Sequence, residues 1–427
     1  MILFQSFGAF MLLALAGVPL VYAMLVATAG SLLVLGLNHP LESLLLSYIG
    51  GVEPFVLIAV PLFMLAGEVI SRGGVGRRIV DFAMKLLGFL PGGMGIATVA
   101  SSLGFGGVSG SAIADTSAIG SVMTPAMIRK GYTRSFSAAL MSTAGTLAVV
   151  MPPSIPMLVY AFVAGVSVRE LFLAGVVPAF VFAAGMAVVC VYVGRRTGCD
   201  NGSRRAPAHE LWRAFVAAGP ALFMPVLILG GIWTGLFTPT EAAAVATFYG
   251  LFVSMVVYRD LKPRDLPQVI LRAFTNSAVV MVVIGATTAL AWLITIEQVP
   301  VQLAALVNEY ASSPWMFLLL VNVALLALGC FIEPVPALVL AAPLLVPLSR
   351  AFGIDPVHLG LIMTCNLAIG LYTPPVGGTL MVGMRLAGAG MWETSRALVP
   401  LFAIGVAILA VVTYVPAVGM ALVHAFR

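Results

Sequence analysis

Residues 145–158 read GTLAVVMPPSIPML, an apolar run of helix length that is interrupted by the adjacent prolines Pro152 and Pro153. Proline has no backbone N–H, so the carbonyl four residues before it in a helix loses its partner. The pair therefore predicts free carbonyls at Ala148 and Val149. In hydrocarbon such groups cost several kcal/mol each, and they are tolerated only where protein or a polar cavity meets them. A broken helix is expected here.

A second proline pair, Pro374 and Pro375 in TPPVGG, follows the first at an offset of 222 residues. It predicts free carbonyls at Gly370 and Leu371 by the same reasoning. Without a gap, this offset also aligns five further pairs: Gly107 with Gly329, Pro125 with Pro347, Gly131 with Gly353, Met141 with Met363 and Pro178 with Pro400. One isolated pair reads as a plain proline kink, but two at one offset indicate an internal repeat.

The composition places the chain in the membrane. Hydrophobic residues make up 61% of its 427 residues, charged residues make up 9%, and the mean hydropathy is +1.11. Apolar runs reach the roughly 20 residues that span a bilayer as helix, and the alternation of a β-barrel is absent. The four cysteines form no metal-binding or disulfide pattern. The net charge of +5 reflects where the loops lie and predicts no nucleic-acid partner. The fold class expected is an all-α polytopic membrane protein.

The repeat divides the chain into two halves. Residues 1–194 form the first, 195–213 a polar cytoplasmic linker, and 214–427 the second. The stretch GGVSGS at 106–111 separates two apolar segments that are too closely joined for each to cross the membrane, which predicts a re-entrant hairpin at 91–130 before a broken helix at 135–165. The second half mirrors this with a hairpin at 314–350, interrupted by EPVP, and a broken helix at 357–386.

Five spans are expected in each half, at about 3–20, 21–38, 50–71, 135–165 and 171–194, and then at about 214–236, 239–258, 270–296, 357–386 and 396–420. The odd number of spans per half inverts the second repeat relative to the first. With the N-terminus outside, 18 of the 21 Lys and Arg residues lie at cytoplasmic ends, leaving only Arg169, Arg350 and Arg427 outside. This predicts both termini outside, the first hairpin opening from the cytoplasm and the second from the opposite side. Residues 72–90 are expected to be an amphipathic interfacial arm with a counterpart at 299–310.

Broken helices within inverted repeats point to a transporter's midplane binding site, where freed carbonyls ligate cations and half-helix N-termini face anions. The hydroxyls of Ser109 and Ser111 lie at the first hairpin tip, and oxygen ligands of low net charge suit a hard monovalent cation such as sodium. Glu333 occupies the repeat position of Ser111, and Thr373 lies beside the second break. Glu333 is interpreted as a cation ligand or proton carrier, with a helix cap as the alternative.

Further polar residues near the breaks are candidates for contact with substrate, although each could equally be a structural side chain within helix packing. They are Asp115, Thr143, Thr146, Ser154, Asn366 and Thr379. Arg385 ends the second broken helix, where it could meet an anionic substrate or extend into the cytoplasm.

Three stretches together carry a family pattern: GGVSGSAIADTSAIGSVMTPAMIRKGY, TLAVVMPPSIPMLVY, and IEPVPALVLAAPLLVPLSRAFGIDPVHLGLIMTCNLAIGLYTPPVGG. They resemble the large membrane subunit of tripartite ATP-independent periplasmic (TRAP) transporters over nearly the whole chain. The resemblance implies an elevator-type, sodium-coupled secondary active importer of organic acids, of the C4-dicarboxylate or sialic acid class, in the bacterial inner membrane. The sequence departs from the family at Gly378 and Thr379, where an Asn often follows the glycine region, so the substrate stays open.

The same resemblance implies partners and sites. A small four-helix membrane subunit is expected as a separate chain, together with a periplasmic substrate-binding protein, and no cofactor beyond the coupling Na+. Family sodium sites lie between each hairpin tip and its broken helix. Carried onto this sequence, they are Ser109, Ser111, Ala148, Val149 and Pro153 for one site, and Glu333, Gly370 and Thr373 for the other.

Three other functions are weighed against this interpretation. A related elevator symporter would take up anions without a binding protein. A membrane transferase or protease is disfavoured because HExxH, a paired-Asp metal motif and clustered histidines are all missing from the sequence, so no enzyme is expected. An ion channel would conduct rather than accumulate its solute.

Overall fold

The computed structural model describes residues 8–10, 12, 13, 17–34, 40–200, 205–298 and 313–426, and within these residues all regular secondary structure is helical. The helices before the linker are α2 (Leu20–Val34), α3 (Leu41–Val52), η1 (Phe55–Ile58), α4 (Ala59–Arg72), α5 (Val75–Leu87), α6 (Gly93–Ser109), α7 (Ala112–Arg129), α8 (Arg134–Gly145), α9 (Leu147–Val150), α10 (Ile155–Ala164) and α11 (Val168–Thr197). Those after it are α12 (Ala208–Trp233), α13 (Pro239–Phe252), η2 (Val253–Val257), η3 (Pro263–Asp265), α14 (Leu266–Ile296), α16 (Pro314–Gly329), α17 (Pro334–Ala351), α18 (Pro356–Gly370), α19 (Gly378–Ala387), α20 (Met391–Tyr414) and α21 (Ala417–Phe426).

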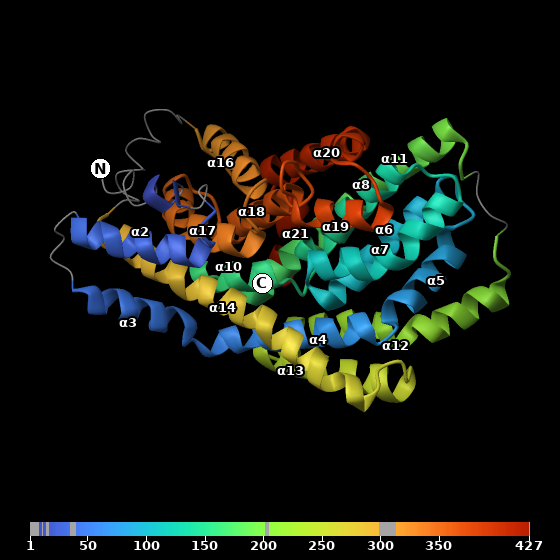
Figure 1. The fold of residues 1–427 in the computed structure, drawn as a ribbon, viewed down its shortest axis with the longest axis horizontal. Helices are drawn as coiled ribbons and strands as arrows, with labels where there is room; N and C mark the ends of the chain where they lie inside the picture. The colour runs from blue at the N-terminus through green and yellow to red at the C-terminus, as the bar shows by residue number, and fades with distance from the viewer. Residues whose placement is uncertain are drawn as a thin grey trace.

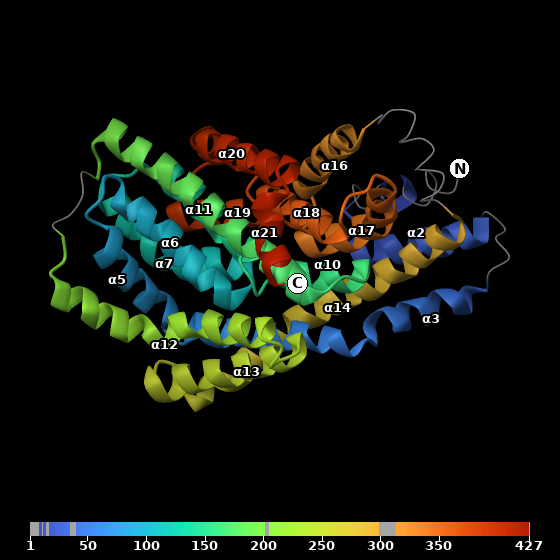
Figure 2. The same cartoon turned by 180° about the vertical axis from the view of Figure 1, so that it is seen from behind.

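The helices form two layers. Figure 1 shows α3, α4, α12, α13 and α14 running along one side of the molecule, with the hairpins and the broken helices above them, and Figure 2 shows the same separation from behind. Within the long layer α4 packs on α13 and α14, and α14 also packs on α2 and α3. The largest cluster of buried apolar side chains lies in the second layer and extends into α4, α12 and α13 of the long layer. The hairpins and breaks are thus held against a wall of long helices.

Both proline pairs break a helix in the way the sequence predicts. The first break separates α8 and α9 from α10, and the axis bends by 41° across it. The second separates α18 from α19. Each pair contains a cis peptide bond, Pro152–Pro153 and Pro374–Pro375. The hairpins precede the breaks as α6–α7 and α16–α17.

The two halves exchange partners reciprocally. The helices before each break pack on their own hairpin, α8 and α9 against α6, and α18 against α16 and α17. The helix after each break packs on the hairpin of the other half instead, α10 against α17 and α19 against α7. Two copies of one plan related by a pseudo-two-fold axis produce this pattern, as inverted-repeat transporters do.

Several element boundaries differ from the expected spans. Helix α3 begins at Leu41, so a separate helix precedes the span expected at 50–71, and the chain interrupts it at Glu53 and Pro54. The span expected at 396–420 is wrong at its end, because α20 stops at Tyr414 and α21 begins after Pro416. A proline after a helix commonly marks such a stop.

The number of spans stays a prediction. Among the described residues, seven helices are long and apolar enough to cross a membrane, or eight if the bent pair around the first break counts as one span. Half of the first expected span, 3–20, lies outside the described residues, as does all of 299–310, the expected counterpart of the arm. The arm itself appears as α5, whose apolar face packs against α6. The division at 195–213 also stays a prediction, and helix occupies its two ends.

Candidate transport site

A cavity of about 130 Å³ lies where the two hairpin tips and the two breaks meet. Its lining combines both hairpins, both broken helices and two helices of the long layer: Met64, Gly110, Ser111, Ala112, Ile113, Val149, Ile155, Pro156, Val279, Val280, Val283, Glu333, Pro334, Val335, Pro336 and Leu371. The tips and breaks are far apart in sequence, so the repeat creates this site only when both halves have folded together.

The lining contains residues at equivalent positions of the two repeats. At the offset of 222, Ser111 corresponds to Glu333, Ile113 to Val335, and Val149 to Leu371, and all six line the cavity. Two of these pairs are apolar on both sides. In the third pair, Ser111 has a hydroxyl where Glu333 has a carboxylate, so this pair makes the two halves of the site chemically different.

The first hairpin tip lies directly on the first break. A Cβ at Gly110, which has a φ of +61°, would come within 2.8 Å of the Pro153 carbonyl oxygen. Only a glycine accepts both this backbone conformation and this approach at low cost. The turn is braced from within, since the Ser111 N–H donates to the Ser109 hydroxyl over 3.2 Å and the Ser109 hydroxyl donates to Asp115. The Asp115 side chain is fully buried.

The second tip approaches its break through two glycines. A Cβ at Gly370 would lie 2.6 Å from backbone atoms of Gly329. The corresponding approach in the first half joins Gly106 and Ala148, at 2.9 Å from a Cβ on Gly106 to the Ala148 Cα. Glu333 stands at the N-cap position of α17, yet its carboxylate makes no capping hydrogen bond, and the side chain is exposed at the cavity. This geometry leaves the carboxylate available for a ligand.

The carbonyls predicted to be free are partly bonded to hydroxyl groups. The Ser154 hydroxyl donates to the Val149 carbonyl over 2.5 Å, and the Thr379 hydroxyl donates to the Leu371 carbonyl over 2.9 Å. The Thr373 N–H donates to the Gly370 carbonyl over 3.0 Å. Each break is therefore stabilised from the helix that follows it, and a carbonyl has a second lone pair with which to meet a ligand.

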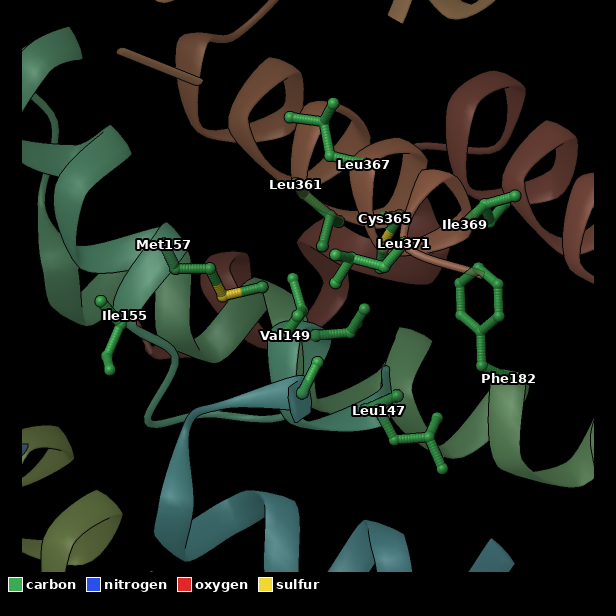
Figure 3. Close-up of a cluster of buried hydrophobic side chains, with 14 of the residues drawn as sticks. Leu147, Val149, Ile155, Met157, Phe182, Leu361, Cys365, Leu367, Ile369 and Leu371 are labelled. Carbon is green, nitrogen blue, oxygen red and sulfur yellow. The ribbon is translucent and has the colours of Figure 1, made fainter. Parts of the chain in front are cut away.

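Figure 3 shows how the two breaks face one another inside the protein. Leu147 and Val149 from the first broken helix lie opposite Leu361, Cys365 and Leu371 from the second. Contacts between α9 and α18 confirm that these segments pack together. This apolar packing between α9 and α18 fixes the two breaks relative to each other beside the cavity.

The cation candidates gather at the two tip-and-break junctions. Ser111, Val149 and Glu333 line the cavity, Pro153 contacts the tip at Gly110, and Gly370 contacts Gly329. In the described part of the chain no group of three or more His, Cys, Asp or Glu residues could hold a metal ion. The available donors are hydroxyls, carbonyls and single carboxylates, a set that fits a hard monovalent cation such as sodium.

The substrate candidates do not line this cavity. Thr143 and Thr146 donate to carbonyls of their own helix, and Asp115 lies inside the hairpin tip. Asn366 donates to the Asn322 side chain over 2.8 Å, and Arg385 is exposed in the last turn of α19. Ser154 and Thr379 donate to carbonyls at the breaks. None of these residues lines the cavity in the conformation described, and their contact with substrate stays a prediction.

Sequence reasoning missed the apolar lining. The side chains of Ile113, Ile155 and Val335 carry no polar atom, so the sequence gives no direct sign that they line a site. A usable signal existed, because extending the 222-residue offset outward from Ser111 and Glu333 pairs Ile113 with Val335.

An all-helical membrane fold whose two hairpins and two broken helices meet at one central cavity defines a secondary transporter. The chain belongs to the family of the DctM component of tripartite ATP-independent periplasmic transporters, whose model matches residues 7–418. It is 42% identical over 370 residues to the C4-dicarboxylate TRAP transporter large permease protein DctM of Pseudomonas aeruginosa, covering 87% of this chain and 86% of the relative.

Two further proteins are similar to this chain, one in sequence and one in fold. The isethionate TRAP transporter permease protein DctMQ of Oleidesulfovibrio alaskensis is 37% identical over 414 residues, covering 97% of this chain and 65% of that protein. The crystal structure of the Alcanivorax borkumensis YdaH transporter matches with a TM-score of 0.58 at 14% identity, covering 90% of each chain, which supports the fold alone. Both sequence relatives are named as permeases, so the family is one of transport proteins rather than enzymes.

Proposed function

We propose that this chain is the permease through which an organic acid enters the cell together with sodium ions. The observation that carries the proposal is that both hairpin tips and both breaks line one cavity. A substrate held there would travel with the hairpins and broken helices as one body along the long helices, which is elevator-type alternating access. The two chemical classes expected from the sequence, C4-dicarboxylates and sialic acids, are the starting panel, and the names of the relatives support organic acids in general.

The proposal includes two partners. A periplasmic binding protein would deliver the acid, and a small four-helix membrane subunit would support the long layer. The DctMQ relative supports the small membrane subunit as a partner. This chain covers only 65% of that protein, and the letters MQ in its name indicate a second component, Q, joined to the M permease. We place the assembly in the bacterial inner membrane with both termini in the periplasm, from the distribution of Lys and Arg.

Sodium would occupy the two tip-and-break junctions as a transported ion. At the first, Ser109, Ser111, Ala148, Val149 and Pro153 offer neutral oxygens. At the second, Glu333, Gly370 and Thr373 offer one carboxylate, one carbonyl and one hydroxyl. Among the described residues that line the cavity, Glu333 is the one acidic side chain, so Glu333→Gln should weaken the dependence of uptake on sodium. Glu393→Gln, at an exposed position in the first turn of α20, is the matched control.

The test is uptake into proteoliposomes that contain this chain and its small subunit. Labelled organic acids are offered with and without an inward sodium gradient and with and without the binding protein. Accumulation that requires both supports the tripartite mechanism. Uptake that ignores the binding protein supports a two-component symporter instead, and lack of uptake under every gradient would overturn the proposed function.

A further inference from the structure

We infer that Asn366 is a positioning residue for the second tip-and-break junction, where it fixes the tip of the second hairpin through Asn322. This inference rests on the proposed function, in which Glu333, Gly370 and Thr373 hold a sodium ion at that junction. Asn366 acts from within the protein, because its side chain is fully buried and does not line the cavity. Its hydrogen bonds, the residues at the corresponding positions of the first repeat and an unpaired amide oxygen support this role.

The hydrogen bonds join three helices. The Asn366 side-chain amide on α18 donates to the Asn322 backbone carbonyl over 2.9 Å and to the Asn322 side-chain oxygen over 2.8 Å, on α16. The Asn322 amide in turn donates to the Thr413 hydroxyl on α20 over 3.1 Å. All three side chains are buried. These three residues, the asparagine link, therefore bind the first helix of the hairpin to the broken helix and to α20.

The asparagine link lies on the same helix faces as the contact between the hairpin tip and the break. Asn366 precedes Gly370 by four residues, about one helical turn, and Asn322 precedes Gly329 by seven residues, about two turns. The two glycines are in close backbone contact. Glu333 follows Gly329 by four residues, at the tip. The two contacts together fix the register and the rotation of α16 against α18, and with them the place of Glu333.

The first repeat has apolar residues where the second has the asparagine link. At the offset of 222, its members Asn322, Asn366 and Thr413 correspond to Ala100, Ala144 and Val191. The first tip is braced instead by hydrogen bonds within the turn between α6 and α7. Small apolar residues let two helices approach closely, whereas directional hydrogen bonds favour one register. The link thus accompanies the junction that contains the carboxylate.

The side-chain oxygen of Asn366 is buried and has no hydrogen-bond partner. Turning the amide over would place this oxygen against the two acceptor oxygens of Asn322, so Asn322 sets the orientation of the amide. An unpaired buried acceptor is destabilising, and apolar residues of similar shape would avoid that loss. Stability alone therefore does not explain the link, whereas a requirement for one fixed position of the tip does.

The first test is sodium-dependent uptake by Asn366→Ala in proteoliposomes of this chain with its small subunit, supplied with the binding protein. The half-saturating sodium concentration should rise at least roughly 5-fold, because the tip is no longer held where Glu333 and the break meet one ion. The maximal rate at saturating sodium should stay near that of the wild type, since bound sodium itself holds the tip in place.

Thr247→Ala is the matched control. The Thr247 hydroxyl on α13 donates to the Leu62 carbonyl on α4 over 2.9 Å, so the variant also loses a buried hydrogen bond between helices. This bond lies within the long layer, and neither residue lines the cavity. The control should lower the melting temperature and leave the half-saturating sodium concentration unchanged.

A double variant tests whether the two asparagines act as one unit. Asn322→Ala combined with Asn366→Ala gives the second repeat the alanines that the first has at these positions. Because each single replacement already breaks the link, the double variant should shift the half-saturating sodium concentration no further than the larger single shift. It also removes the acceptor that Asn366→Ala leaves unpaired, so it should fold at least as well as that single variant.

Hydrogen–deuterium exchange provides a readout that does not depend on transport. In purified protein without sodium, the backbone amides of 330–333 at the second tip should exchange about 10-fold faster in Asn366→Ala than in the wild type. The amides of 110–114 at the first tip should keep their rates, because the replaced residue belongs to the other hairpin's contacts.

The outcomes separate the inference from the proposed function. A higher half-saturating sodium concentration, with faster exchange at the second tip alone, supports the inference. Unchanged sodium dependence, a shift that Thr247→Ala reproduces, or single shifts that multiply in the double variant would overturn it. Wild-type uptake that ignores sodium overturns the proposed coupling. The exchange rates then decide by themselves, since faster exchange at the second tip supports the positioning role and unchanged exchange refutes it.

Discussion

Asp200 anchors the base of the first hairpin at a distance from the cavity. Its carboxylate accepts hydrogen bonds from the Met94 N–H over 2.8 Å and from the Tyr132 hydroxyl over 3.2 Å, while its backbone carbonyl accepts from the Gly92 N–H over 2.9 Å. The side chain is 6% exposed. Burial raises the pKa of Tyr132, so this phenol stays protonated and donates throughout the neutral range. One residue at the start of the linker therefore joins α6, the turn before α8 and the end of α11.

Asp200→Ala should lower the free energy of unfolding by about 3 kcal/mol, because it leaves two buried donors without a partner. The measurement is the melting temperature of the purified protein. Asp81→Ala is the matched control, since Asp81 pairs with Lys85 at the surface over 3.0 Å and such pairs contribute roughly 0–1 kcal/mol. Equal losses in the two variants would contradict the anchoring role.

Single residues were the least predictable level from sequence. Ser109, Ser111 and Glu333 were identified as tip residues, because glycines and an acid in apolar surroundings stand out. Ser154 and Thr379 are predicted to contact substrate, and in the structure they donate to the carbonyls of Val149 and Leu371. Their contact with substrate stays a prediction. A hydroxyl near a break can serve either purpose, and only three-dimensional geometry decides between them. Asp200 gave no signal, since its partners lie on another element.

Among the elements, the breaks depend on hydroxyl groups supplied by the helices that follow them. Ser154→Ala should lower the free energy of unfolding by about 2 kcal/mol, because it removes both the N-cap of α10 and the donor to the Val149 carbonyl. Ser154→Thr keeps a hydroxyl and should retain most of the stability. The thermal unfolding midpoints of the two variants provide the check, and an alanine variant as stable as the threonine variant would refute this role.

Close approach of two glycines holds the second hairpin tip against its break. Gly370→Ala places a Cβ 2.6 Å from the Gly329 backbone, so the tip and the helix must separate. Overpacking of this kind costs about 1–3 kcal/mol, and uptake should fall with stability.

Gly219→Ala is the control for this change. A Cβ at Gly219, in the interior of α12, meets nothing within 4 Å, so uptake should stay at the wild-type level. Melting temperatures and initial uptake rates of both variants give the comparison. A Gly370 variant that matches the Gly219 variant in both would show that the contact is dispensable.

Elements were predicted better than residues because their signals are repeated. Proline pairs, interrupted hairpins and long apolar runs each appear twice, and the helices of all four predicted elements begin and end within two residues of the expected bounds. The breaks at Glu53–Pro54 and Val415–Pro416 were not expected, because each lies inside an apolar region where composition alone does not distinguish one helix from two.

At the level of the whole molecule, the membrane orientation is a prediction from charge. In a cysteine-free background, Arg350→Cys should react with a membrane-impermeant maleimide in intact cells, and Arg213→Cys only after lysis. Both positions are exposed in the structure, so access to the reagent reports the side of the membrane. The reverse pattern of labelling would invert the proposed topology, and labelling of both in intact cells would refute the span count.

The repeat-related walls of the cavity also bear on thermodynamics. Ile113 and Val335 come from hairpins that open from opposite sides in the predicted topology, and they present nearly the same apolar surface to whatever lies between them. These two walls therefore favour neither side of the membrane, and the chemical difference between the repeats lies at Ser111 and Glu333. In the proposed transport cycle the electrochemical gradients set the direction of net flux, and reversing those gradients should reverse the flux.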